Sequence, residues 1–266
     1  MNVTPATAED FSETLSHQFS DDGRERLLSL PGEPLFLADW ERALFIHYEV
    51  DAALLQRELP FALDLWHGKA FVSLVAFTMH DMHPRLGGRA AVWLIKPIAT
   101  HRFLNVRTYV KHDGERGIYF ITEWLSNWLS VQLGPLLYGL PYRYAKLDYR
   151  HTHGQDRLFG KVVAPGQGQL VYEARLATDA RCSPCKNDSL DEFLLERYTA
   201  YTSRGTTRRT FRVWHPPWPQ MRPQVSVVDN SLLTKAWPWF QTAKFVGANY
   251  STGLRDVWMG RSRFVK

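Results

Sequence analysis

One short segment of the chain carries side chains that could bind and convert a small molecule. Four polar or ionisable residues alternate along it, and they are Asn105, Arg107, Tyr109 and Lys111. Alternate side chains of a β-strand share a face, so these four would lie opposite the apolar Val106 and Val110. Such a face is either a solvated edge of a sheet or the wall of a polar pocket.

Arg107 and Lys111 would support different chemistry. A guanidinium is a planar fork that suits a carboxylate, whereas a lysine becomes a Schiff-base nucleophile only when burial or a neighbouring cation lowers its pKa. We take Lys111 as the candidate catalytic residue and Arg107 as the candidate anchor of a ligand, with Asn105, Tyr109 and His47 as further ligand contacts. A solvated Lys111 and an Arg107 on the surface remain open alternatives.

The elements that would position these residues are mostly strands. Asp113-Gly114 predicts a turn where positive φ is favourable, so residues 103–124 should form an antiparallel hairpin. The other predicted strands cover residues 43–50, 69–79, 142–150, 156–163, 168–178 and 210–214, with a last hairpin at 245–258. Helices are predicted at 52–58, at 127–138, and at 190–202 behind the capping box Ser189 to Glu192.

Other motifs give little support for a metal or cofactor site. Cys182-Ser-Pro-Cys185 precedes the predicted helix at 190–202, whereas a thioredoxin-type pair stands at a helix amino terminus. A zinc site would need two more ligands at matched spacing. Functionless loop cysteines, adventitious metal binding and a reversible disulfide stay open for this pair. The chain contains no H-E-x-x-H, P-loop or G-x-S-x-G motif, so we expect no metal and no cofactor.

Composition is that of a globular protein with 45% hydrophobic, 22% charged and 14% aromatic residues. The net charge is +5, and basic residues concentrate at Arg204–Arg212, which is either a solvated strand face or a nucleic-acid surface. No apolar run reaches the roughly 20 residues that span a bilayer, and the acidic residues near the amino terminus do not resemble a signal peptide. We therefore expect a cytoplasmic protein with no membrane partner.

The domain organisation is predicted to be simple. Residues 1–35 would form a polar, partly mobile arm with a helical part at 24–30, and residues 36–266 one domain. The fold class is α+β, mainly antiparallel β, with two or three helices.

Several segments together resemble a bacterial family known as domain of unknown function 2071. They include 45–51, 59–65, 104–110 with 117–120, 138–142, 189–198, 215–218 and 250–253, in the family's order. The family is related in fold to acetoacetate decarboxylase, so the resemblance implies a cone-shaped β-barrel around a small-molecule cavity. It also places Lys111 at the Schiff-base lysine of the decarboxylase motif Tyr-Pro-Lys-Lys, with Val110 and His112 replacing the Pro and the second Lys.

Three functions follow, in order of preference. The first is a pocket for an acidic or carbonyl ligand, open to lyase-type chemistry if Lys111 turns inward. The second is a non-catalytic binding or sensing domain on the same fold. The third, ranked last, is nucleic-acid binding through Arg204, Arg208, Arg209 and Arg212. A homo-oligomer is compatible with each of them.

Overall fold

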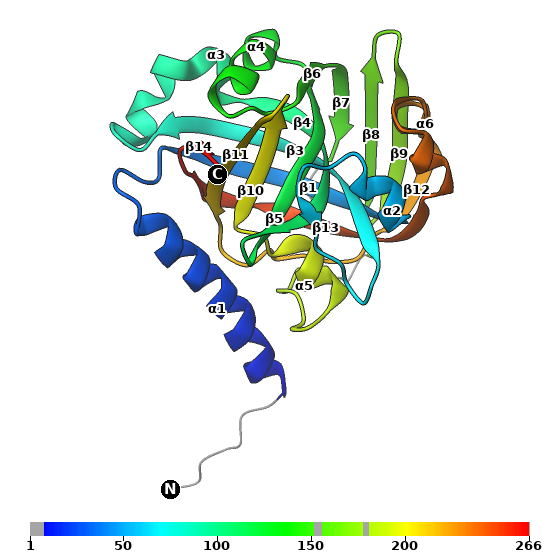
Figure 1. Cartoon of the computed structure of the whole chain (residues 1–266), viewed down its shortest axis with the longest axis horizontal. Helices are drawn as coiled ribbons and strands as arrows, with labels where there is room; N and C mark the ends of the chain where they lie inside the picture. The colour runs from blue at the N-terminus through cyan, green and yellow to red at the C-terminus, as the bar shows by residue number, and fades with distance from the viewer. Residues whose placement is uncertain (1–7, 152–155, 178–180, 266) are drawn as a thin grey trace, which may run out of the picture.

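The computed structural model describes residues 8–151, 156–177 and 181–265, with side chains from residue 18 onward (Figure 1). The described strands are β1 (Phe36–Val50), β2 (Ala62–Leu63), β3 (Ala70–Pro84), β4 (His101–His112), β5 (Glu115–Leu125), β6 (Tyr142–Tyr144), β7 (Lys146–Arg150), β8 (Arg157–Ala164), β9 (Gly168–Arg175), β10 (Thr199–Arg204), β11 (Thr207–Trp214), β12 (Gln224–Asp229), β13 (Lys244–Met259) and β14 (Arg263–Phe264). The described helices are α1 (Ala8–Leu28), α2 (Ala52–Gln56), η1 (Gly88–Ile95), α3 (Lys96–Ala99), α4 (Trp128–Leu137), α5 (Leu190–Leu195), α6 (Ser231–Ala236) and η2 (Pro238–Thr242).

Two sheets form the body of the molecule. In the larger one the pairings run β4-β3-β1-β13-β11-β10-β5, and β5 also pairs with β4, so the path of hydrogen bonds returns to its start. Most pairs are antiparallel, while β10–β5 and β5–β6 are parallel. The second sheet has the order β12-β9-β8-β7. The α+β class with mainly antiparallel strands is therefore confirmed.

Alternation along the strands creates the two larger of three apolar clusters, one on each face of the large sheet. On β1, Phe45 joins an apolar cluster on one face of the large sheet, and Leu44 and Ile46 join a cluster on the other face. The second cluster is completed by apolar side chains of the small sheet, such as Leu158 and Tyr172. Because the small sheet covers the outer face of β1, β3 and β4, both faces of these strands are buried.

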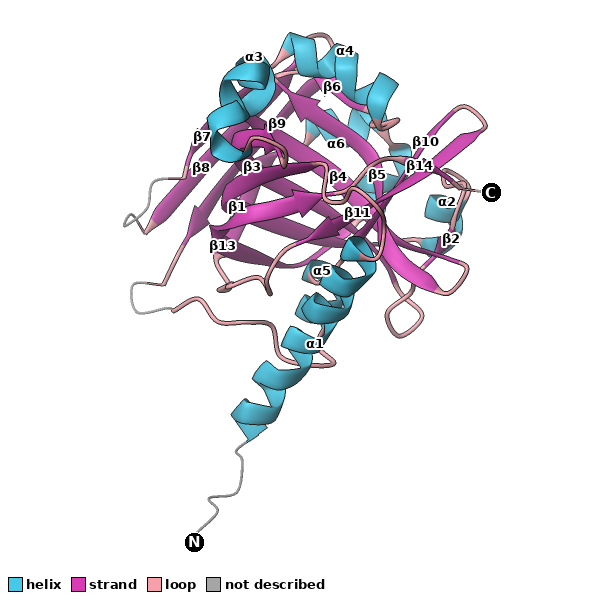
Figure 2. Ribbon diagram, turned by 90° about the vertical axis from the view of Figure 1, so that its left-hand side faces the viewer, coloured by secondary structure: helices cyan, strands magenta, loops and turns pink. Residues whose placement is uncertain are grey.

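Helices close the two ends of the space inside the large sheet. The segment η1–α3 and helix α4 lie together at one end, and α5 lies at the opposite end (Figures 1 and 2). Asn127 is the N-cap of α4, where its side chain accepts a hydrogen bond from the Ser130 amide. We refer to η1, α3 and α4 together as the cap.

Helix α1 is longer than predicted. It begins at Ala8, whereas the sequence predicted helix only from Arg24; residues 1–7 of the predicted arm lie outside the described residues. Its carboxyl-terminal half is held on β11, since Trp214 Nε1 donates a hydrogen bond to the Ser20 carbonyl at 2.9 Å and Leu27 is fully buried. The body begins with β1 at Phe36.

Three other predictions are wrong in part. The helix predicted at 190–202 ends at Leu195, and the chain enters β10 at Thr199. The predicted last hairpin is the single strand β13. The described residues form six α-helices rather than two or three, and four of the six have six residues or fewer, which is too short for an apolar period to appear. No helix in the described part is long and apolar enough to cross a membrane.

Candidate functional site

The space inside the large sheet contains a cavity of about 180 Å³. Its wall is mostly aromatic and aliphatic and includes Trp40, Phe45, Phe77, Phe103, Phe120, Leu133, Tyr142, Phe211 and Trp218. An engineered cavity of about 150 Å³ in another protein admits benzene, so this one has room for a molecule built around a single ring. The few polar groups that line it therefore decide what it binds.

Arg107 is the strongest of these polar groups. Its side chain is buried in the cavity wall, one Nη2–H donates to the Leu194 carbonyl at 3.1 Å, and the guanidinium carbon lies 5.5 Å from the Phe45 ring centroid. Among the described residues its Nε has no hydrogen-bond partner, and no carboxylate comes within ion-pair distance. A buried cation without a counter-ion is costly, so this arrangement favours an anionic ligand.

Asn105 and Glu123 form a second polar pair in the wall. They are cross-strand partners on β4 and β5, and Asn105 Nδ2 donates to Glu123 Oε1 at 3.2 Å. Burial raises the pKa of Glu123 to about 8, against smaller opposing effects of Asn105 and Arg107, so the carboxyl is mostly protonated at neutral pH. Asn105 Oδ1 and Glu123 Oε2 are left without partners and can meet a ligand.

Sequence reasoning missed Glu123 and also His101, which both line the cavity. Burial lowers the pKa of His101 to about 4, so the ring is neutral, and neither of its nitrogens has a partner in the described part of the chain. His101 stands on the same face of β4 as Asn105 and Arg107, and this alternation was the available signal.

His47 and Tyr109 lie behind the wall and do not line the cavity. His47 Nδ1 is 2.7 Å from Ser73 Oγ, which is also hydrogen-bonded to the hydroxyl of Tyr109. The Tyr109 hydroxyl donates a hydrogen bond to the Leu194 carbonyl at 3.0 Å, and this oxygen also accepts the hydrogen bond from Arg107. Burial lowers the pKa of His47 to about 3, so this chain of hydrogen bonds is uncharged. Both residues therefore position Arg107 through the Leu194 carbonyl.

Lys111 lies outside the cavity. It is exposed near the end of β4 and pairs with Arg116 across the hairpin, just before the turn at Asp113. A solvated ammonium has no desolvation to activate it as a Schiff-base amine. The described residues that line the cavity include no lysine at all. Of the alternatives that the sequence left open, the structure shows the solvated one for Lys111 and the pocket wall for Arg107, and Asn105 lines the same cavity.

The other charges in and behind the cavity wall already have partners. Arg197 donates a hydrogen bond to the Asp64 carboxylate at 2.7 Å, and Arg116 donates another to the same carboxylate at 2.8 Å. Glu196 accepts from the Tyr198 hydroxyl at 2.6 Å and from the Trp218 amide at 2.9 Å. These contacts fix the chain between α5 and β10, and they leave Arg107 as the free cation among the described residues of the wall.

The other sequence motifs lie away from the cavity. Cys182 and Cys185 are free thiols in the loop before α5, and burial raises the pKa of both, which is the opposite of a reactive pair. No cluster of metal-binding side chains occurs among the described residues. In the basic strand, Arg212 pairs with Glu115 at 2.7 Å and Arg209 donates to the Leu137 carbonyl at 3.0 Å.

Comparison with known proteins identifies the family. A family model described as an uncharacterized conserved protein, domain of unknown function 2071, matches residues 37–245. The chain belongs to this family. Its relative YqjF of Bacillus subtilis (strain 168), an uncharacterized protein, is 26% identical over 212 residues, which cover 79% of this chain and 85% of that protein.

Solved structures show the fold to be that of acetoacetate decarboxylase-like enzymes. Acetoacetate decarboxylase from Legionella pneumophila is similar with a TM-score of 0.57 and 16% identity, covering 91% of this chain and 95% of that one. The enduracididine biosynthesis enzyme MppR, solved in complex with pyruvate, has a TM-score of 0.59 and 14% identity, covering 90% and 93%. At these identities the likeness concerns the fold alone.

Proposed function

We propose that this protein binds a small organic acid with an apolar, ring-sized body in the cavity, with the ligand carboxylate on Arg107. The observation that carries the proposal is the buried guanidinium in the wall of an aromatic cavity, without a carboxylate partner among the described residues. We further propose that the closed path of strand pairings is the cone-shaped barrel of the acetoacetate decarboxylase-like fold. The pyruvate complex of MppR is consistent with an acid in this fold.

The second polar pair adds a requirement on the ligand. A mostly protonated Glu123 can donate a hydrogen bond through Oε2, and Asn105 Oδ1 can accept one. Asn105 and Arg107 are two residues apart on one strand face, so their backbone positions are about 7 Å apart. A ligand with a carbonyl or hydroxyl group besides its carboxylate could therefore meet both polar positions.

Proton-transfer catalysis is a second candidate. A carboxyl with a pKa near 8 can both give and take a proton at neutral pH, which a general acid or base requires. In this scheme Arg107 would hold the carboxylate of an oxo acid. The carboxylate form of Glu123 would take a proton from the carbon beside the carbonyl, which leaves an enolate, and the Glu123 carboxyl would then return a proton to that carbon. Retention of a deuterium label at the carbon beside the carbonyl of a bound oxo acid would contradict this candidate.

Matched ligands test the binding proposal. Thermal unfolding is followed with phenylacetate and phenylpyruvate and with their uncharged primary amides, because a ligand that binds the native state raises the melting temperature. We expect the acids to stabilise the protein and the amides to have little effect. Equal stabilisation by acids and amides would contradict a role for Arg107 as carboxylate anchor.

A further inference from the structure

The outer surface of the cap is unusually apolar. Helix α4 has no charged residue, although it lies at the surface. The exposed large apolar side chains of the cap and its flanks are Leu86, Trp93, Leu94, Trp128, Leu129, Leu136 and Leu137. Surface helices normally present a polar outer face, and apolar residues gathered in one patch mark an interaction site.

The two parts of the cap form one surface. Helices α3 and α4 lie side by side in both views (Figures 1 and 2). Asn127, the N-cap of α4, donates a hydrogen bond from Nδ2 to the carbonyl of Pro97 in α3. Trp93 and Trp128, which are 72% and 66% exposed, are therefore carried by elements that are fixed to each other.

The charges of this region all have one sign. Residues 85–100 and 126–146 contain no Asp or Glu, although the whole chain has 27. Their basic residues are Arg85, Arg89, Lys96, Arg143 and Lys146. All five are exposed, and four of them make no ion pair with a described residue.

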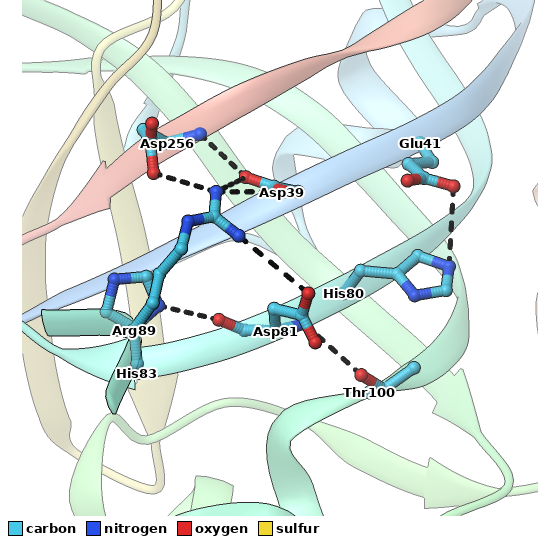
Figure 3. Close-up of polar contacts among 8 residues, drawn as sticks. All are labelled: Asp39, Glu41, His80, Asp81, His83, Arg89, Thr100 and Asp256. Carbon is cyan, nitrogen blue, oxygen red and sulfur yellow. Dashed lines mark hydrogen bonds and ion pairs between the residues drawn. The ribbon is translucent and has the colours of Figure 1, made fainter. Parts of the chain in front are cut away.

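Arg89 is the exception, because it pairs with three carboxylates. Its Nη2 donates to both oxygens of Asp39 at 3.0 Å and to Asp256 at 3.1 Å, while Nη1 is 3.8 Å from Asp81 (Figure 3). This network fixes η1 to the ends of β1, β3 and β13. It therefore has a structural role, and the remaining four basic residues are free to meet an external anion.

We propose that the cap is a contact site for an anionic lipid surface, with its tryptophan and leucine side chains in the interfacial layer and its free basic residues on lipid phosphates. Exposed Trp beside Lys and Arg is the composition that favours this layer. The proposal replaces the expectation of no membrane partner, because that expectation concerned only segments that span a bilayer.

A second copy of the chain fits this surface less well. In a twofold dimer the same patch would face itself, so Lys96 and Arg143 would meet like charges. The two segments offer no carboxylate to pair with them, and like charges across an interface are unfavourable. An anionic lipid surface supplies the missing partner charge.

The position of the cap gives such contact a consequence. Ile98, Ser130 and Leu133 line the cavity from the inner side of the cap. The same short helices thus separate the cavity from the proposed lipid contact. An apolar ligand dissolved in the bilayer could therefore enter the cavity directly through the cap. The lipid contact itself does not depend on the proposed function.

Sedimentation with vesicles tests the proposal. The full chain is centrifuged with vesicles of phosphatidylcholine alone and of phosphatidylcholine mixed with phosphatidylglycerol. We expect binding to the anionic vesicles, weaker binding to the neutral ones, and loss of binding as salt is raised. The double variant Lys96→Glu/Arg143→Glu should bind at least about 25-fold more weakly, since each basic residue near an anionic surface contributes a factor of about five.

Matched variants separate this surface from general effects. Lys161→Glu/Arg175→Glu makes the same charge change at exposed sites of the small sheet and should bind as the unmodified protein does. Trp93→Gln/Trp128→Gln should abolish binding, while Phe264→Gln, which also changes an aromatic residue that is 72% exposed, should not. Circular dichroism verifies that each variant is folded.

Three results would overturn the proposal. The first is no sedimentation with anionic vesicles. The second is equal binding of the cap variants and their controls. The third is a stable dimer in light scattering that dissociates when Trp93 and Trp128 are replaced, since the cap would then be covered by a second copy.

Discussion

Replacing Glu123 by Gln should remove a pH dependence from the stability of the protein. The carboxyl has a folded-state pKa of about 8, against 4.5 for an ordinary glutamate, because it is buried. The folded protein therefore holds a proton that the unfolded chain releases above about pH 4.5. The stability linked to this group is complete below about pH 4.5 and is lost as the pH rises through about 8.

The size of the effect follows from the two pKa values. The pKa values of the unfolded and folded states, 4.5 and about 8, differ by between three and four. A difference of one corresponds to about 1.4 kcal/mol, so the free energy of unfolding should decrease by up to about 5 kcal/mol. Such a change is comparable to the whole stability of many domains, which is about 5–15 kcal/mol. Glutamine keeps the shape and the hydrogen bond to Asn105 but carries no proton to lose.

Denaturant titrations at about pH 5 and about pH 9 measure this difference. The stability of the unmodified protein should fall more than that of Glu123→Gln, so the variant should be the more stable form at the higher pH. Glu173→Gln, at an exposed position of β9, provides the control and should follow the unmodified protein. If Glu123→Gln lost stability with rising pH as steeply as the unmodified protein, Glu123 would not be the group that causes the pH dependence.

Three further predictions concern single residues. Borohydride treatment in the presence of an oxo acid should give no adduct at Lys111, because its ammonium is solvated; a trapped adduct there in mass spectra would contradict its placement. Ser189→Ala should lower the free energy of unfolding by about 1 kcal/mol, because Ser189 Oγ accepts a hydrogen bond from the Glu192 amide. Cys185 should be alkylated by iodoacetamide only in denaturant, because it is buried and its thiol pKa is raised; rapid labelling of the folded protein would argue against this.

The hairpin shows how far the sequence alone could go. Asp113 and Gly114 form the predicted turn with φ of 50° and 78°, and Asn105 and Arg107 share the predicted face. A regular two-residue hairpin would place Thr122 opposite Asn105. A β-bulge between Val106 and Arg107 shifts the register by one residue and brings Glu123 there instead. A one-residue shift exchanges the faces of a strand, and local sequence does not reveal it.

The helix predicted at 190–202 failed for a different reason. Its start was correct, because Ser189 Oγ accepts a hydrogen bond from the Glu192 amide as the motif predicts, although the Glu192 side chain accepts one from the Asp188 amide rather than from that of Ser189. Beyond Leu195 the three-residue spacing of Tyr198 and Tyr201 favours a helix, whereas the Tyr and Thr residues of this segment favour a strand. Pairing with β5 and β11 resolves this ambiguity in favour of β10, and these partners are distant in sequence.

The most direct test of the account is the affinity of the cavity for an aromatic carboxylate in two variants of one strand. Arg107→Met removes the buried guanidinium, and Lys111→Met removes an exposed cation from the same strand. Calorimetric titration of phenylpyruvate should show binding weakened at least about 30-fold in Arg107→Met, since loss of a buried charged partner costs about 2–5 kcal/mol. Lys111→Met should bind like the unmodified protein. Equal affinities for all three proteins would contradict the assignment of Arg107 as the carboxylate anchor.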